Sequence, residues 1–112
     1  MLNQNRRRVF LDLKNPRVQE LSRKYNLQPK AVAYIRQAIG SKEYTKETLI
    51  RHIGIANYKR HKAIEVHKID IRLTPERREK LIEYTMINIK FREGVVDFLR
   101  QIEQDQLDDI LN

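Results

Sequence analysis

Histidine and carboxylate side chains are the groups of this chain that could bind a metal ion or transfer a proton. The three histidines are His52, His61 and His67, and no two of them lie one helical turn apart, as zinc ligands on a helix do. Asp12 and Asp70 occupy equivalent places in two similar segments, but their Arg and Lys neighbours favour ion pairing over magnesium binding. We therefore expect structural histidines, no metal site and no cofactor.

The sequence also lacks the signatures of covalent catalysis. It has no cysteine and only three glycines, so a thiolate nucleophile is excluded and a glycine-rich phosphate loop has few residues to form from. No serine stands in a nucleophile motif. These observations predict that the protein is not an enzyme.

Cationic side chains are present in excess. The formal net charge of the 112 residues is +8. The last ten residues hold four acids and no Lys or Arg, so residues 1–102 carry +12 once those four charges are set aside. Such a balance favours nucleic acid or an anionic membrane surface as a partner. No apolar run is long enough to span a bilayer, and no signal-peptide core follows Met1–Arg8, so we expect a cytoplasmic protein without a membrane partner.

Residues 18–37 have the spacing of a helix-turn-helix. Asn26 suits the turn, because asparagine tolerates the left-handed backbone conformation. Leu27, Val32 and Ile35 fall at the buried positions of such a unit. Amide and cationic side chains on the outer face of the second helix suit base edges and phosphates. The residues predicted on that face are Gln28, Lys30, Ala33, Tyr34 and Gln37.

The connection from Lys42 to Val66 is too long and too regular for a plain loop. Thr45 can cap one helix, Gly54 can end it and Asn57 can cap another, which makes a second helix-turn-helix candidate. We expect its basic outer side to contact phosphates rather than bases. The residues concerned are Lys59, Arg60 and Lys62.

Residues 8–13 and 68–73 alternate apolar and polar side chains, as strands do. A cap and a proline follow each segment, in Asn15-Pro16 and in Thr74-Pro75, and both pairs favour the start of a helix. The helix after the second segment is expected to break near Asn88, because asparagine often ends helices.

Together these elements predict one DNA-binding domain, residues 1–112. It comprises strand-helix-helix units at 8–39 and 67–104, a helical connection at 42–66 and an acidic tail at 103–112. The expected fold is α+β and mostly helical, with a short antiparallel strand pair and an internal pseudo-twofold axis. We interpret the tail as a frayed end; the alternative is a short helix that docks on the basic surface of a partner.

Residues 66–104 resemble the ribbon-helix-helix family of DNA-binding proteins, in the order of alternating strand, proline-started helix, turn and second helix. The resemblance implies that the outward strand residues Lys68, Asp70 and Arg72 enter the major groove. It also implies that the start of the second helix, around Lys90 to Arg92, holds a phosphate.

The whole chain is similar in size, charge and expected layout to the TraN-type accessory proteins of Gram-positive conjugative plasmids. That resemblance implies binding to duplex DNA near transfer origins, through a helix-turn-helix at each end of a strand pair. Gln28, Lys30 and Tyr34 would read one site. The residues facing a second site would be Arg92, Glu93, Asp97 and Arg100.

We therefore predict sequence-specific binding of double-stranded DNA by insertion of a helix-turn-helix into the major groove. The role would be that of a regulator or of an accessory factor in DNA processing or conjugative transfer, with other DNA-processing proteins as further partners. The chain would act as a pseudo-symmetric monomer or as a homodimer. Two other classes stay open: an RNA-binding or ribosome-associated basic protein, and a protein-interaction module.

Overall fold

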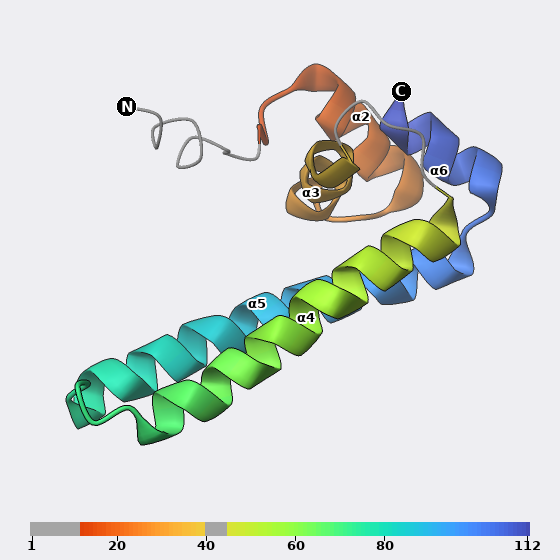
Figure 1. The fold of residues 1–112 in the computed structure, drawn as a ribbon. Coiled ribbons are helices and arrows are strands. Elements are labelled where there is room, and N and C mark those ends of the chain that lie inside the picture. Colours follow the sequence, from red (N-terminus) through yellow and green to blue (C-terminus); the bar gives the residue numbers. More distant parts are fainter. Residues whose placement is uncertain (1–11, 40–44) are drawn as a thin grey trace, which may run out of the picture. The chain divides into compact units, whose positions relative to one another are not determined.

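The computed structural model describes residues 12–39 and 45–112, and all the regular elements in these ranges are helices (Figure 1). They fall into two compact units, one holding α2, α3 and nearly all of α6, and the other holding α4 and α5. The helices are α2 (Pro16–Tyr25), α3 (Pro29–Ile39), α4 (Lys46–Ile69), α5 (Pro75–Gln101) and α6 (Gln104–Leu111).

The start and the end of α2 follow from local side-chain chemistry. The Asn15 side chain accepts hydrogen bonds from the backbone N–H groups of Arg17 at 2.8 Å and Val18 at 3.4 Å, ahead of the proline that opens the helix. Asn26 ends α2 in the left-handed conformation, with φ 52° and ψ 51°. The Leu27 N–H then donates to the Ser22 carbonyl at 3.0 Å. The predicted cap and turn are confirmed.

Apolar side chains from all three helices of this unit are buried. Val18 and Leu21 of α2 are 3% and 0% exposed. The buried residues of the other two helices are Ala31, Val32, Ala33 and Ile35 in α3, and Leu107 and Ile110 in α6. The prediction of a frayed acidic tail is therefore wrong, because the tail forms the helix α6 and the apolar side of this helix is buried. Its acidic residues stand between the buried apolar residues in the sequence.

The second unit is a helical hairpin in which α4 and α5 run antiparallel, side by side (Figure 1). Thr45 and Thr74 cap the two helices, each accepting a backbone N–H three residues on, from Thr48 at 3.1 Å and Arg77 at 3.2 Å. Both caps were expected from the sequence and are confirmed. The buried apolar side chains are Leu49, Ile53 and Ile64 in α4, and Ile89, Val95 and Leu99 in α5.

The predicted strand pair is wrong. Lys68 and Ile69 form the end of α4, and the chain then turns, with the Leu73 N–H donating to the Asp70 carbonyl at 3.2 Å. Ile69 and Ile71 are 76% and 93% exposed, so their alternation does not mark a buried face. Residues 8–11 of the other expected strand lie outside the described residues, and residues 12–13 are not part of a strand. Within the described ranges the fold is all-α rather than α+β.

The expected helix breaks at Gly54, Asn57 and Asn88 are also wrong. α4 runs for 24 residues through the first two positions and α5 for 27 residues through the third. The second helix-turn-helix and the ribbon-helix-helix arrangement are therefore absent from these helices. Because α2 and α3 have only 10 and 11 residues, the two helix pairs are not equivalent and do not support an internal pseudo-twofold axis.

Candidate nucleic-acid interface

One face of α3 gathers three of the four polar residues predicted on the outer face of the first helix-turn-helix. Lys30, Tyr34 and Gln37 follow each other at intervals of four and three residues, which places them on one side of a helix. Lys30 and Gln37 are exposed and Tyr34 is half-buried. Gln28 is exposed too, but it precedes the helix, where its carbonyl accepts the N–H groups of Ala31 at 2.9 Å and Val32 at 3.1 Å.

The inner side of α3 fixes the direction of that polar face. Val32 and Ile35 are completely buried. Ala33 is 4% exposed, so its expected place on the outer face is wrong. The exposed surface of α3 is therefore narrower than predicted, and the cation it presents there is Lys30.

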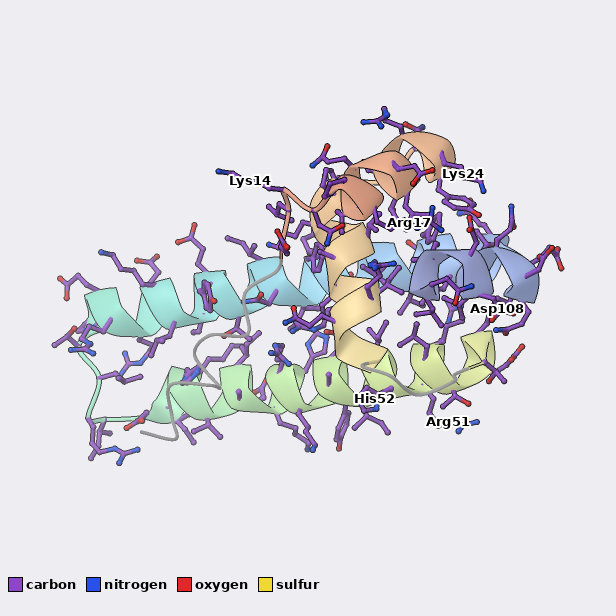
Figure 2. All side chains as sticks on the ribbon, turned by 90° about the horizontal axis from the view of Figure 1, so that it is seen from above. Lys14, Arg17, Lys24, Arg51, His52 and Asp108 are labelled. Carbon is purple, nitrogen blue, oxygen red and sulfur yellow. The ribbon has the colours of Figure 1, made fainter. Side chains whose placement is uncertain are left out.

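A cluster around Asp109 attaches α6 to α2 within the same unit. The Asp109 carboxylate accepts hydrogen bonds from Arg17 Nη2 at 2.8 Å, Lys24 Nζ at 2.8 Å and Tyr25 Oη at 2.6 Å. Figure 2 shows Arg17 and Lys24 on α2. The last turn of α6 has a further partner, because Arg36 of α3 donates to the Ile110 carbonyl at 2.9 Å. Sequence reasoning missed this cluster.

Within the cluster the pKa of the aspartate is lowered, and the pKa values of the two cations and of the tyrosine are raised. The aspartate and the cations therefore stay charged, and the tyrosine keeps its proton. The bonds from Lys24, Tyr25 and Arg17 hold the pKa of Asp109 well below its usual range. The bond to Asp109 raises the pKa of Lys24, and burial together with the same carboxylate raises the pKa of Tyr25. Arg17 also pairs with Glu20 at 3.0 Å, and the two acids raise the pKa of its guanidinium.

The three predicted phosphate contacts on α4 do not form one basic face. Arg60 is half-buried and donates from Nη1 to the Ala56 carbonyl of its own helix at 3.4 Å. Lys62 is exposed, and its Nζ lies 5.5 Å from the centroid of the Tyr58 ring. Lys59 is exposed as well and, three positions before Lys62, lies on the same side of the helix, so Arg60 is the residue that falls away from the other two.

The remaining predicted contacts lie apart from one another along α4, the turn and α5. Lys68 pairs with Glu65 at 3.6 Å. The Arg72 side chain makes two bonds to the Asp70 carboxylate, of 2.9 Å and 3.0 Å. Those bonds and the Arg72 backbone N–H lower the pKa of Asp70 to about 2.

The two arginines predicted in the second half of α5 differ in exposure. Arg92 is half-buried and donates to the Asn88 carbonyl at 3.3 Å, within its own helix. Arg100 is exposed in the last turn of α5. The structure thus gathers Lys30, Tyr34 and Gln37 on one surface of α3, whereas the predicted cations of the helical hairpin do not form one surface.

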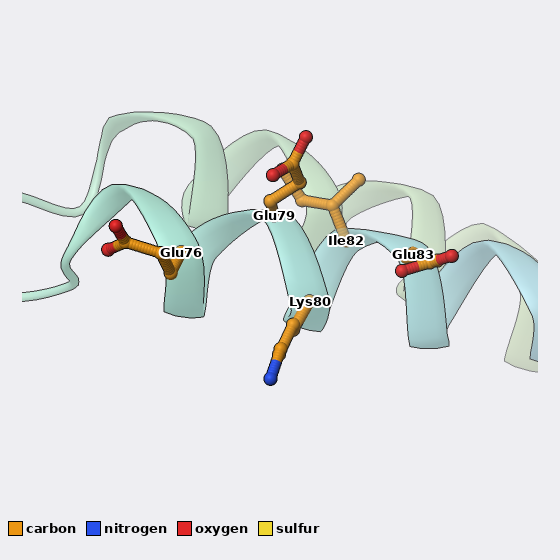
Figure 3. Close-up of a pocket in the computed structure, with 5 residues that line it drawn as sticks. All are labelled: Glu76, Glu79, Lys80, Ile82 and Glu83. Carbon is orange, nitrogen blue, oxygen red and sulfur yellow. The ribbon is translucent and has the colours of Figure 1, made fainter.

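An open hollow of about 470 Å³ lies along the first turns of α5 (Figure 3). Three of its five lining residues are glutamates, which repel phosphate, and Lys80 points away from Glu79 (Figure 3). This hollow therefore does not suit nucleic acid. Its lining residues are Glu76, Glu79, Lys80, Ile82 and Glu83.

Metal binding and membrane insertion find no support in the described ranges. Residues 12–39 and 45–112 contain no group of three His, Asp or Glu side chains that could hold a metal ion. No helix in these ranges has the length and apolar character needed to cross a bilayer. No protein-family model, curated protein or solved structure matches the chain.

Proposed function

We propose that the protein binds double-stranded DNA and inserts α3 into the major groove. One observation carries the proposal: Lys30, Tyr34 and Gln37 lie on one face of α3, opposite the buried Val32 and Ile35. A short turn that begins at Asn26 joins α3 to the helix that supports it. A helix held this way can present amide, phenol and ammonium groups to base edges and phosphates.

The charge of the chain supports the same partner. A net charge of +8 attracts the phosphate backbone over a distance that depends on salt. The Asp109 carboxylate would oppose such binding if it faced the duplex. Its bonds to Arg17, Lys24 and Tyr25 direct it to α2 instead, so its charge is compensated within the protein.

The role that follows is that of a regulator or of an accessory factor in DNA processing or transfer. The two roles differ in where the preferred sequence lies, beside promoters or beside origins of transfer. RNA is the main competing ligand, because the same cations attract any phosphate backbone. A-form RNA has a deep and narrow major groove, which does not admit a helix face such as that of α3.

Selection of bound duplexes from a random pool tests the proposal, with an RNA pool of the same length as competitor. We expect enrichment of a short duplex motif. Lys30→Ala should then weaken binding to that motif by about 1–3 kcal/mol, or roughly 5- to 150-fold, if Lys30 contacts a base. Lys80→Ala, in the glutamate-lined hollow of α5, is the matched control and should bind as the wild type does.

Two outcomes would contradict the proposal. Preferential recovery of RNA would favour the alternative of an RNA-binding or ribosome-associated protein. Equal binding of the Lys30→Ala and wild-type proteins to the selected duplex would show that α3 does not read the DNA. In that case the cations of α4 and α5 become the first candidates for the contact.

A further inference from the structure

The outer side of α4 exposes large apolar side chains over more than half of the helix. Ile55, Tyr58, Val66 and Ile69 are 50%, 62%, 55% and 76% exposed. Lys62 lies midway between them in the sequence and is also exposed. We call these five residues the outer stripe of α4.

The outer stripe is distinct from the side of α4 that contacts α5. That contact side is marked by Asn57, which donates from Nδ2 to the Ile89 carbonyl of α5 at 3.3 Å. At about 100° of rotation per residue, Asn57, Ile53 and Ile64 share one side and the outer stripe falls on the opposite side. α4 therefore has two apolar sides, and α5 covers only one of them.

We propose that the outer stripe is the contact between two copies of this chain, with their α4 helices antiparallel. The stripe residues are separated by three, four, four and three positions, an order that reads the same from either end. An antiparallel copy centred on Lys62 therefore places Ile55 opposite Ile69 of the second copy, and Tyr58 opposite its Val66. Such a contact is isologous, with the same surface on both copies.

The exposed area matches the requirement of a weak dimer. Four large side chains, each with half or more of its surface exposed, form a patch of roughly 500 Å² on one copy. Two copies together bury about 1,000 Å², the lower bound for a specific interface. We therefore expect a dimer whose population rises with protein concentration.

Arg51, exposed and four positions before Ile55 on the same side of α4, favours the antiparallel orientation. Lys62 at the centre of the stripe bears on the register instead, since a single cationic residue in an apolar helix contact fixes register at some cost in stability. Its Nζ lies over the Tyr58 ring of its own helix, 5.5 Å from the centroid, so the ammonium group is directed along the helix. In a parallel pair, Lys62 and Arg51 would each face the same residue of the second copy. In the antiparallel pair only Lys62 faces its equivalent.

Cysteine cross-linking tests this register, because the chain has no cysteine of its own. Lys62→Cys places two thiols at the twofold axis and should give a disulfide-linked dimer under mild oxidation. Ile55→Cys should cross-link poorly alone and efficiently when mixed with Ile69→Cys. Glu83→Cys, an exposed position on α5, is the control and should stay uncross-linked. Efficient cross-linking of Ile55→Cys alone would overturn the antiparallel arrangement.

Sedimentation equilibrium of the full chain supplies an independent measurement. The wild type should pass from the 13.5 kDa monomer toward twice that mass as its concentration increases. Ile69→Glu should raise the dimer dissociation constant at least tenfold and leave the helical circular dichroism unchanged. Ile87→Glu, at a 57% exposed site on α5, should leave it unchanged.

Two sedimentation results would overturn the dimer: a wild type that stays monomeric at high concentration, or equal effects of the two Glu substitutions. A monomer that captures a different protein on the stripe would overturn it too. The DNA proposal rests on α3 and is independent of these outcomes, since duplex selection measures it in monomer and dimer alike.

Discussion

Arg17 and Asp109 are 92 positions apart in the chain, yet Nη2 of the arginine lies 2.8 Å from Oδ1 of the aspartate. The same Nη2 also donates to the Asp109 carbonyl at 2.9 Å. One guanidinium group therefore holds both the side chain and the backbone of α6 against α2. The helix pair that carries the candidate DNA-contacting face is stabilised by the last residues of the chain.

Asp109→Asn should reduce stability at neutral pH, and the reduction should become smaller in acid. Because folding lowers the pKa of Asp109, this carboxylate stabilises the native protein above the ordinary Asp pKa of about 4. That contribution is lost as pH falls from about 4 toward the lower pKa of the folded state. Urea unfolding followed by circular dichroism, at pH 7 and again near pH 2, measures the difference.

Asp108→Asn is the control for this measurement, because Asp108 is the neighbouring acid of α6 and makes none of the three bonds of Asp109. It should change stability less than Asp109→Asn does at pH 7. Equal effects of the two variants would mean that the general charge of α6 matters and the specific cluster does not. A deficit of Asp109→Asn that is as large near pH 2 as at pH 7 would contradict the linkage.

Leu107→Ala should destabilise the unit formed by α2, α3 and α6 by about 2–5 kcal/mol, the usual cost of emptying a buried leucine site. Leu107 is completely buried although it stands among the acids of the C-terminal segment. Leu111→Ala is the matched control, because Leu111 is only half-buried and should cost less. If neither change alters the urea midpoint, α6 does not contribute to the core.

Helix starts could be predicted from the sequence because their signals are local. Asn15 and Thr74 each stand before a proline and cap a helix, and Thr45 caps another. Asn26 takes the left-handed conformation expected of it. In each case a side chain bonds a backbone group a few residues away, or a single residue sets its own dihedral angles. Contacts with distant parts of the chain are therefore not needed to predict these helix ends.

Interior breaks and distant contacts could not be predicted, because tertiary packing decides them. Gly54 and Asn88 have modest helix propensity, yet packing along a long hairpin outweighs a cost of about 1 kcal/mol or less at each site. The alternation of Ile69 and Ile71 suggested a strand, but both side chains are exposed at the hairpin turn. The pairing of Arg17 with Asp109 leaves no pattern in either local sequence.

Asn15→Ala should cost about 0.5–2 kcal/mol, because two backbone N–H groups at the start of α2 lose their side-chain acceptor. Asn15→Asp keeps an acceptor at the same position and should retain most of the stability. Thermal unfolding by circular dichroism compares the two variants. An alanine variant as stable as the aspartate variant would mean that solvent satisfies those groups equally well.

Asn57→Leu should stabilise the hairpin of α4 and α5, by about 1–2 kcal/mol in urea unfolding. Asn57 is 8% exposed, and its Oδ1 has no hydrogen-bond partner among the described residues, so folding leaves a polar atom unpaired. Leucine has the same branching at Cγ, with two larger methyl groups, and removes that atom at the cost of the 3.3 Å bond to the Ile89 carbonyl. Asn88→Leu is the control, since that side chain is half-buried and bonds the Tyr84 carbonyl of its own helix. It should change stability by less than about 0.5 kcal/mol. A destabilised Asn57→Leu protein would instead show that the amide contributes to the fit of the two helices.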